Sequence, residues 1–189
     1  MRNAARAVLG LLATALALTP AMATTALERS ETDLIQESAI IVTGHCTHLQ
    51  SQWVDRTLVT IATISVSEVL KGRAGAEVTV VLPGGTDVHR RVPIAMTFPA
   101  APQMYQQEEV LLFLTLEERV ANGYTIVGFS QGKFTLADNG QGQKVASQNL
   151  SALNLQGRTG AVTRGRAKTL LLAELRQKIQ ETPAAERPR

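Results

Sequence analysis

The residues best suited to chemistry lie in one short segment, His45-Cys46-Thr47-His48. Imidazole nitrogens and thiolate sulfurs are preferred ligands of zinc and copper. In a regular strand, however, only Cys46 and His48 project to the same side, and zinc takes three or four protein ligands. A metal site would therefore need His89 as well. A metal-binding protein or metalloenzyme using Cys46, His48 and His89 is kept as an alternative, while the main expectation is a chain without a cofactor.

No comparable pattern indicates covalent or acid–base catalysis. A nucleophilic enzyme needs a Ser or Cys with a His base and an orienting acid. Residues 128–132, Gly-Phe-Ser-Gln-Gly, match the letters G-x-S-x-G around Ser130, but they lie in a turn between predicted strands and not in the strand–turn–helix context of a nucleophile elbow. Ser130 precedes Gln131-Gly132, which is typical of a turn hydroxyl. The carboxylate pairs Glu108-Glu109 and Glu117-Glu118 flank an apolar run, where charges mark the exit of a strand into solvent. We assign no catalytic residue and expect a protein that is not an enzyme.

The first 23 residues indicate export. Arg2 and Arg6 give a positive start, residues 8–18 form an uncharged run, and Ala21-Met22-Ala23 supplies the small residues that a signal peptidase requires. The run is shorter than the roughly 20 residues of a membrane-spanning helix, so we expect no transmembrane segment in the mature chain. The mature protein is predicted to begin near Thr24 and to be periplasmic or secreted.

Charge is unevenly distributed along the chain. Residues 24–156 hold nine basic and thirteen acidic side chains, whereas residues 157–189 hold eight basic and three acidic ones. The basic end is expected to be the solvated face of a helix, with contact to an anionic surface as the weaker alternative. Nucleic-acid binding is not expected, because it needs a basic groove with stacking aromatics, and the acidic core carries only seven aromatic residues.

Alternating apolar residues predict a β-rich domain. Residues 40–47 alternate between two faces, and residues 57–70 change their apolar parity near Ala62, which predicts a β-bulge of the kind that curves a sheet into a barrel. Residues 110–116 are apolar on both faces and need two covering layers. Residues 86–95 form a weaker edge strand, and residues 96–109 a long irregular loop.

Strand signals end near residue 151, and a helix is expected over residues 169–179. Its apolar stripe would cover the outer face of the 110–116 strand, with Thr169 as N-cap and Pro183 as the stop. The chain has one cysteine, so no intramolecular disulfide forms and Cys46 is expected to be a small buried residue.

Several short motifs resemble exported bacterial proteins of unassigned function. The motifs are Gly44, Ser51-Gln52-Trp53, the Glu-Val-Leu-Lys-Gly of residues 68–72, Pro83-Gly84-Gly85, the Glu-x-Val-Leu-Leu-Phe-Leu of residues 108–114 and the Gly-x-x-Gln-Gly-Lys-Phe of residues 128–134. The small barrel of these proteins is similar to the OB-like barrel of netrin-type and tissue-metalloprotease-inhibitor (TIMP-like) domains. Such inhibitors use an N-terminal Cys to reach the protease zinc, whereas this mature chain would begin Thr24-Thr25-Ala26. The resemblance therefore implies a fold and carries over no inhibitory residue.

The predicted fold is mainly β, a small OB-like closed or partly open barrel of five to seven strands with a C-terminal helix packed against it. The expected organisation is a signal peptide (1–23), an N-terminal lead-in with a short helix (24–38), the barrel (39–150), a linker and C-terminal helix (151–182) and a disordered tail (183–189).

The expected function is that of an exported, non-enzymatic binding module whose partner is another exported protein, a protease being one candidate class. Its contact surface would combine residues 50–57, 83–88 and 96–107, with Trp53, Arg56, Phe98 and Tyr105 as binding residues. A protease-inhibitor-like protein that works without N-terminal zinc chelation is the first alternative.

Overall fold

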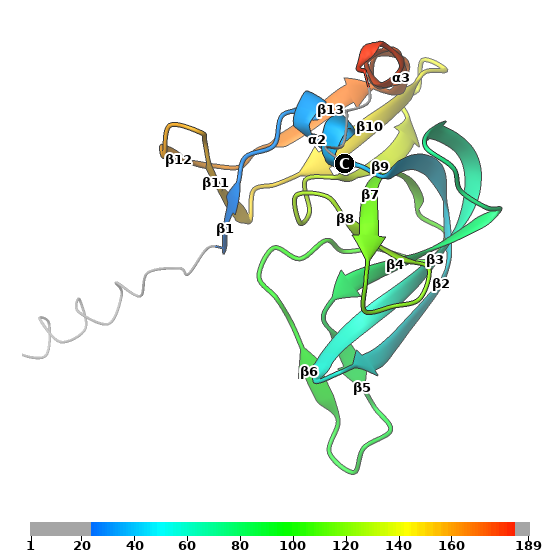
Figure 1. The fold of residues 1–189 in the computed structure, drawn as a ribbon, viewed down its shortest axis with the longest axis vertical. Helices are drawn as coiled ribbons and strands as arrows, with labels where there is room; N and C mark the ends of the chain where they lie inside the picture. The colour runs from blue at the N-terminus through cyan, green and yellow to red at the C-terminus, as the bar shows by residue number, and fades with distance from the viewer. Residues whose placement is uncertain (1–23, 184–189) are drawn as a thin grey trace, which may run out of the picture.

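The structure, a computed structural model, describes residues 24–183, and the chain there is mainly β with a C-terminal helix packed on a sheet (Figure 1). The expected signal peptide and residues 184–189 of the expected tail lie outside this range. Within the described residues there are two helices, α2 (Glu31–Glu37) and α3 (Leu172–Glu181). Both lie at the same end of the molecule, and the opposite end tapers to a single hairpin.

Most of the strands belong to one large sheet of eight, in the order β13-β10-β9-β7-β2-β3-β4-β8. Strand β7 also pairs with β8, so that the pairings from β7 through β2, β3, β4 and β8 return to β7. The bounds of the strands are β2 Ile40–Val54, β3 Thr57–Lys71, β4 Glu77–Pro83, β7 Glu109–Glu117, β8 Gly123–Ile126, β9 Lys133–Asp138, β10 Lys144–Asn149 and β13 Ala167–Leu171.

A second sheet, which was not predicted from the sequence, pairs the first described strand with strands that come after residue 150. Strand β1 (Thr24–Leu27) pairs in parallel with β11 (Leu153–Gln156), and β11 pairs with β12 (Val162–Arg164). The predicted lead-in is therefore ordered as a strand before its short helix α2, and the predicted linker contains β11, β12 and β13. These strands are four, three and five residues long, so each is too short to show the sustained alternation from which strands are predicted, and all residues of β12 are exposed.

Strand β7 separates two apolar layers, as its sequence predicts. Val110, Leu112 and Leu114 contribute to the core between the curved strands, and Leu111 and Phe113 contribute to the core beneath the helices. Leu34 and Ile35 of α2 and Leu172, Leu175 and Ile179 of α3 complete this second core. The expected packing of the C-terminal helix is confirmed, but Leu116 is 59% exposed because β7 leaves the core at that point.

Helix α3 begins at Leu172, three residues later than predicted. Thr169 is not its N-cap, because it lies in β13 opposite Ser147 and its hydroxyl lies 3.1 Å from the Ser147 hydroxyl. Pairing with β10 thus keeps residues 167–171 extended although their sequence suits a helix.

The bulge predicted near Ala62 of β3 is wrong in its position, because Ala62 pairs in regular register with Leu49 and the nearest bulge lies in β2 at Thr47. Cys46 lies opposite Ile64 and His48 opposite Thr63, so Thr47 is an extra residue without a cross-strand partner. Its hydroxyl donates to the Thr63 carbonyl at 3.2 Å. Because the extra residue reverses the alternation, Cys46 is buried and His48 is exposed. The expectation that these two side chains share a face is therefore wrong.

Candidate functional site

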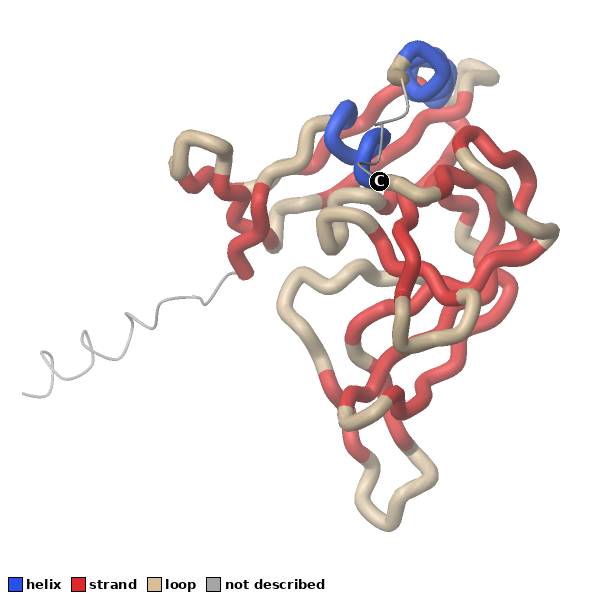
Figure 2. Tube along the Cα trace, in the orientation of Figure 1, coloured by secondary structure: helices blue, strands red, loops and turns tan. Residues whose placement is uncertain are grey.

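The tapered end of the molecule is a short hairpin formed by β5 (Gly85–Asp87) and β6 (Ile94–Met96). Residues 88–93 connect the two strands and form the end of the molecule farthest from the helices (Figure 2). The predicted edge strand over residues 86–95 is therefore wrong in part, because its centre is a loop. We call residues 85–96 the distal hairpin.

The Ser51-Gln52-Trp53 motif fixes the base of the distal hairpin. Ser51 and Trp53 are alternate residues of β2, so their side chains leave the strand on the same side. The Ser51 hydroxyl accepts a hydrogen bond from the Thr86 amide at 3.0 Å, and the Trp53 indole N–H donates to Asp87 Oδ2 at 2.7 Å. The motif thus binds two successive residues of β5.

Glycines allow the hairpin to approach β2 and β3 closely. Gly84 has φ +92°, and its carbonyl accepts a hydrogen bond from the Thr60 hydroxyl at 2.8 Å. A Cβ on Gly85 would lie 2.7 Å from the Ser51 hydroxyl oxygen, so only glycine permits the Ser51–Thr86 contact. The two glycines of the Pro83-Gly84-Gly85 motif are therefore needed for the backbone conformation and the close packing of this site.

Asp87 accepts several of the hydrogen bonds that fix the hairpin base. Besides the indole N–H, it accepts the His89 amide at 3.1 Å and Arg90 Nε at 3.0 Å. The Arg90 guanidinium carbon also lies 5.0 Å from the centroid of the Trp53 ring, a distance at which a cation is attracted to the ring face. Hydrogen bonding by the Trp53 indole, followed by the His89 amide and Arg90, holds the pKa of Asp87 below its ordinary value.

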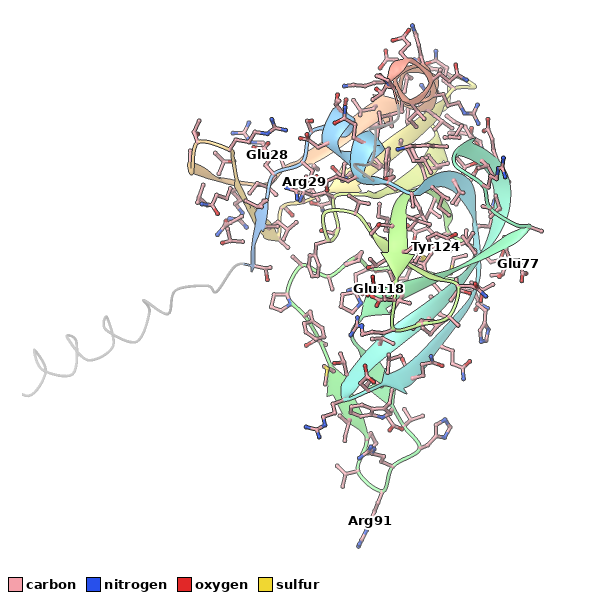
Figure 3. The ribbon with its side chains drawn as sticks, in the orientation of Figure 1. Glu28, Arg29, Glu77, Arg91, Glu118 and Tyr124 are labelled. Atoms are coloured by element: carbon pink, nitrogen blue, oxygen red, sulfur yellow. The ribbon has the colours of Figure 1, made fainter. Side chains whose placement is uncertain are left out.

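The far end of the hairpin is apolar and basic. Val88 and Val92 are 61% and 72% exposed, which is unusual for valine, and Arg91 projects from the extreme tip (Figure 3). Residues 88–93 contain no acidic side chain. The site therefore combines a fixed base with an exposed tip that can bury apolar surface and place a positive charge against a partner.

The residues predicted to bind lie at two separate places. Trp53 is half-buried at the hairpin base, and Arg56 is exposed in the turn between β2 and β3. Phe98, 39% exposed, lines a cavity of about 230 Å³ together with Gly84 and Thr86. Tyr105, 66% exposed, lines a different cleft with Glu108.

Of the three predicted loops, residues 50–57 are not a loop. Strand β2 continues to Val54, and a tight turn at Asp55 and Arg56, with φ +54° at Asp55, leads directly into β3. The irregular segment is residues 97–108, which contain no strand or helix.

The possible metal ligands do not converge. Cys46 is fully buried, and its thiol makes a long contact of 3.7 Å with the His48 carbonyl. Burial, with a smaller effect of the Glu108 charge, raises the pKa of this thiol above its ordinary value. His48 is exposed, and His89 lies in the hairpin loop. Within residues 24–183 no three His, Cys, Asp or Glu side chains are grouped as a metal site would require.

The sequence placed Asp87 and Val88 in a predicted contact loop without indicating a role for either, and it gave no indication of Arg90 or Val92. Their only signal was two valines without apolar neighbours in a segment of basic residues, which fits a weak edge strand equally well. Within the same described range, no helix combines the length and apolar character that crossing a membrane requires. Comparisons of the chain with protein-family models, curated proteins and solved structures gave no match.

Proposed function

We propose that this protein is an exported, non-enzymatic interaction module that binds another exported protein through the distal hairpin. The observation that carries the proposal is the exposure of Val88 and Val92 at the end of a hairpin whose base is fixed by Trp53 and Asp87. Exposed apolar side chains on a rigid support favour association, because little conformational entropy is lost when they are buried. The N-terminal signal pattern supports export.

The charge of the hairpin loop indicates which chemical groups the surface of the partner should carry. Arg90 is engaged by Asp87, whereas Arg91 has no ion pair among the contacts of the described residues. We propose that the partner offers an apolar depression with an acidic group near its floor or rim. A cleft of this kind in a protease would make the protein inhibitor-like, with no role for an N-terminal zinc ligand.

The proposed scaffold for this hairpin is a five-stranded OB-like barrel formed by β7, β2, β3, β4 and β8. The return of the strand pairings to β7 supports it, although β4 and β8 pair over only two residues. In this arrangement the hairpin leaves the barrel between β4 and β7, and its tip is displaced from the helical end.

Crosslinking capture from envelope and secreted fractions tests the proposal. The mature protein, the Val88→Ser Val92→Ser double variant and a Val162→Ser control would be compared. Val162 is matched because it is 55% exposed on β12, outside the hairpin. We expect the wild type and the control to capture one dominant protein, and the double variant to lose at least about 2 kcal/mol of binding free energy to it. Equal capture by the double variant, at unchanged folding stability, would refute a hairpin interface.

A further inference from the structure

A second hollow, separate from the distal hairpin, lies between the irregular segment and the sheet. It has a volume of about 550 Å³, within the usual range of small-molecule sites. One wall is formed by residues 100–108, and the other by β9, β10 and residues 150–153. We call it the polar cleft, and neither the fold nor the proposed hairpin interface requires it.

Its floor is an ion pair that is mostly removed from solvent. Lys133 Nζ lies 2.6 Å from Glu108 Oε1, and the two side chains are 12% and 9% exposed. The Thr135 hydroxyl donates to the same carboxylate oxygen at 2.6 Å, and the Tyr105 amide donates to Oε2 at 3.0 Å. Removing two charges from water costs free energy even when they are paired. A buried ion pair therefore contributes little more to folding stability than apolar residues of similar volume would, which favours a role for this pair beyond stability.

The charge of the polar cleft indicates what it excludes. Glu108 and Lys133 are its only charged lining residues, and they neutralise one another. An anionic or cationic ligand would therefore meet no excess of opposite charge. An apolar ligand is equally disfavoured, because it would cover the polar groups of the walls without bonding them.

Several wall groups are free to bond a ligand. The Ser130 and Ser151 hydroxyls make no hydrogen bond to any described residue. The side-chain oxygen Oδ1 of Asn149 accepts a hydrogen bond from the Ser151 backbone amide at 3.0 Å, which orients the Asn149 side chain and leaves its Nδ2 group free to donate. Lys133 has three N–H donors and bonds only Glu108 and Thr135, so one donor remains. The lining thus mixes donors and acceptors at short spacing.

An exposed aromatic ring lies at the rim. Tyr105 is 66% exposed, yet its backbone is fixed on both sides because its amide bonds the Glu108 carboxylate and its carbonyl accepts the Glu108 amide at 3.1 Å. A flat ring on a fixed backbone offers an apolar face at low entropic cost. Sugar rings have this combination of surfaces, with hydroxyls around the edge and C–H groups on one face.

We propose that the polar cleft is a binding site for a neutral oligosaccharide. One sugar ring stacks on Tyr105, and its hydroxyls bond Ser130, Ser151, Asn149 and the free Lys133 donor. The Glu108–Lys133 pair holds the donor in place and keeps the site neutral. This site is independent of the hairpin, so a sugar and a protein partner could be bound together.

Titration of the isotope-labelled mature protein with maltotriose, cellotriose and chitotriose, followed by NMR, tests the proposal, with trigalacturonate as the charged counterpart. We expect at least one neutral trisaccharide to shift the amides of residues 103–108 and 147–153 and to leave those of residues 85–96 unchanged. Trigalacturonate should bind at least about tenfold more weakly. No shift by any neutral trisaccharide at millimolar concentration, or equal binding of the charged one, would overturn the proposal.

Three variants distinguish stacking of the sugar on the Tyr105 ring from a general loss of order in the irregular segment. Tyr105→Ala should weaken binding about tenfold, and Tyr105→Phe should retain most of it because the ring face remains. Phe98→Ala is the control, since Phe98 is another exposed aromatic of the irregular segment but does not line the polar cleft. Equal losses in Tyr105→Ala and Phe98→Ala would overturn the stacking role.

Discussion

At the scale of single residues, Trp53 positions the hairpin and does not lie at its exposed tip. Its indole N–H is bonded to Asp87 and one face of its ring is near Arg90, so it is half-buried between two strands. From the sequence, Trp53 is expected to be a binding residue of the contact surface. The hydrogen-bond acceptor could not be predicted, because Asp87 is 34 residues away and only the fold brings it to Trp53.

The lowered pKa of Asp87 predicts an acid transition confined to the hairpin. Because the folded-state pKa lies below the ordinary 3.8, the stabilisation is complete above pH 3.8 and is lost as the pH falls through the lowered value. Trp53 is the only tryptophan, so its fluorescence reports this contact directly. We expect constant emission from about pH 7 to about pH 5 and a change below pH 3.8.

The Asp87→Asn variant is the control for this transition. It keeps an oxygen acceptor but has no carboxyl group to titrate, so the transition should disappear. If the change in emission persisted unaltered in Asp87→Asn, it would report other carboxyl groups, and the assignment to Asp87 would be wrong.

At the scale of elements, the long apolar strands could be predicted from the sequence, and the short strands could not. The two covered faces of β7 could be predicted, because its apolar residues occupy both odd and even positions. The bulge was predicted at Ala62 of β3, whereas it lies at Thr47 of β2. Strands β1, β11 and β12 are only four, four and three residues long, which is too short for a sustained pattern. The pairing of β1 with β11 also joins residues as distant in sequence as Thr24 and Leu153. The distal hairpin was predicted as one edge strand, because its two strands are only three residues long.

Substitution of Gly44 tests how closely the backbones of β2 and β3 approach one another next to a register shift. A Cβ there would overlap the Ser65 carbonyl oxygen and lie 2.9 Å from Cγ2 of Ile64. We expect Gly44→Ala to lower the free energy of unfolding in urea by about 2–3 kcal/mol, because backbone atoms must move. Gly75→Ala is the control, since its nearest atom would be 3.7 Å away, and we expect a change within about 0.5 kcal/mol. Equal effects of the two substitutions would contradict the close approach.

At the scale of the whole molecule, the uneven charge is used largely within the fold. Arg158 pairs with Asp33 at 2.7 Å, Arg176 pairs with Glu68 at 2.5 Å, and Lys168 and Lys178 both pair with Glu31. The basic C-terminal segment thus forms ion pairs with acidic residues that come much earlier in the chain. The sequence showed the imbalance but could not show this pairing, because it depends on where α2 and α3 meet.

Glu31 links three elements and should contribute measurably to stability. Hydrogen bonding to Lys178, followed by Lys168, holds the pKa of Glu31 below its ordinary 4.5, so its stabilisation is present above pH 4.5 and is lost as the pH falls below it. We expect Glu31→Gln to cost about 1 kcal/mol in urea unfolding at neutral pH and low salt, and less in high salt. Glu118→Gln is the control, since Glu118 is exposed and has no ion pair among the described contacts. A salt-independent loss, or an equal loss in the control, would contradict the linkage.

The parallel pairing of β1 with β11 has a consequence for the time course of folding. Thr24 lies opposite Leu153, so the first described strand cannot find its partner until more than four-fifths of the chain has been synthesised. Closing so long a loop is slow compared with forming the neighbouring hairpins. Strands β1 and β11 therefore dock last, and until they do, the edge of β11 stays open to any other extended segment nearby.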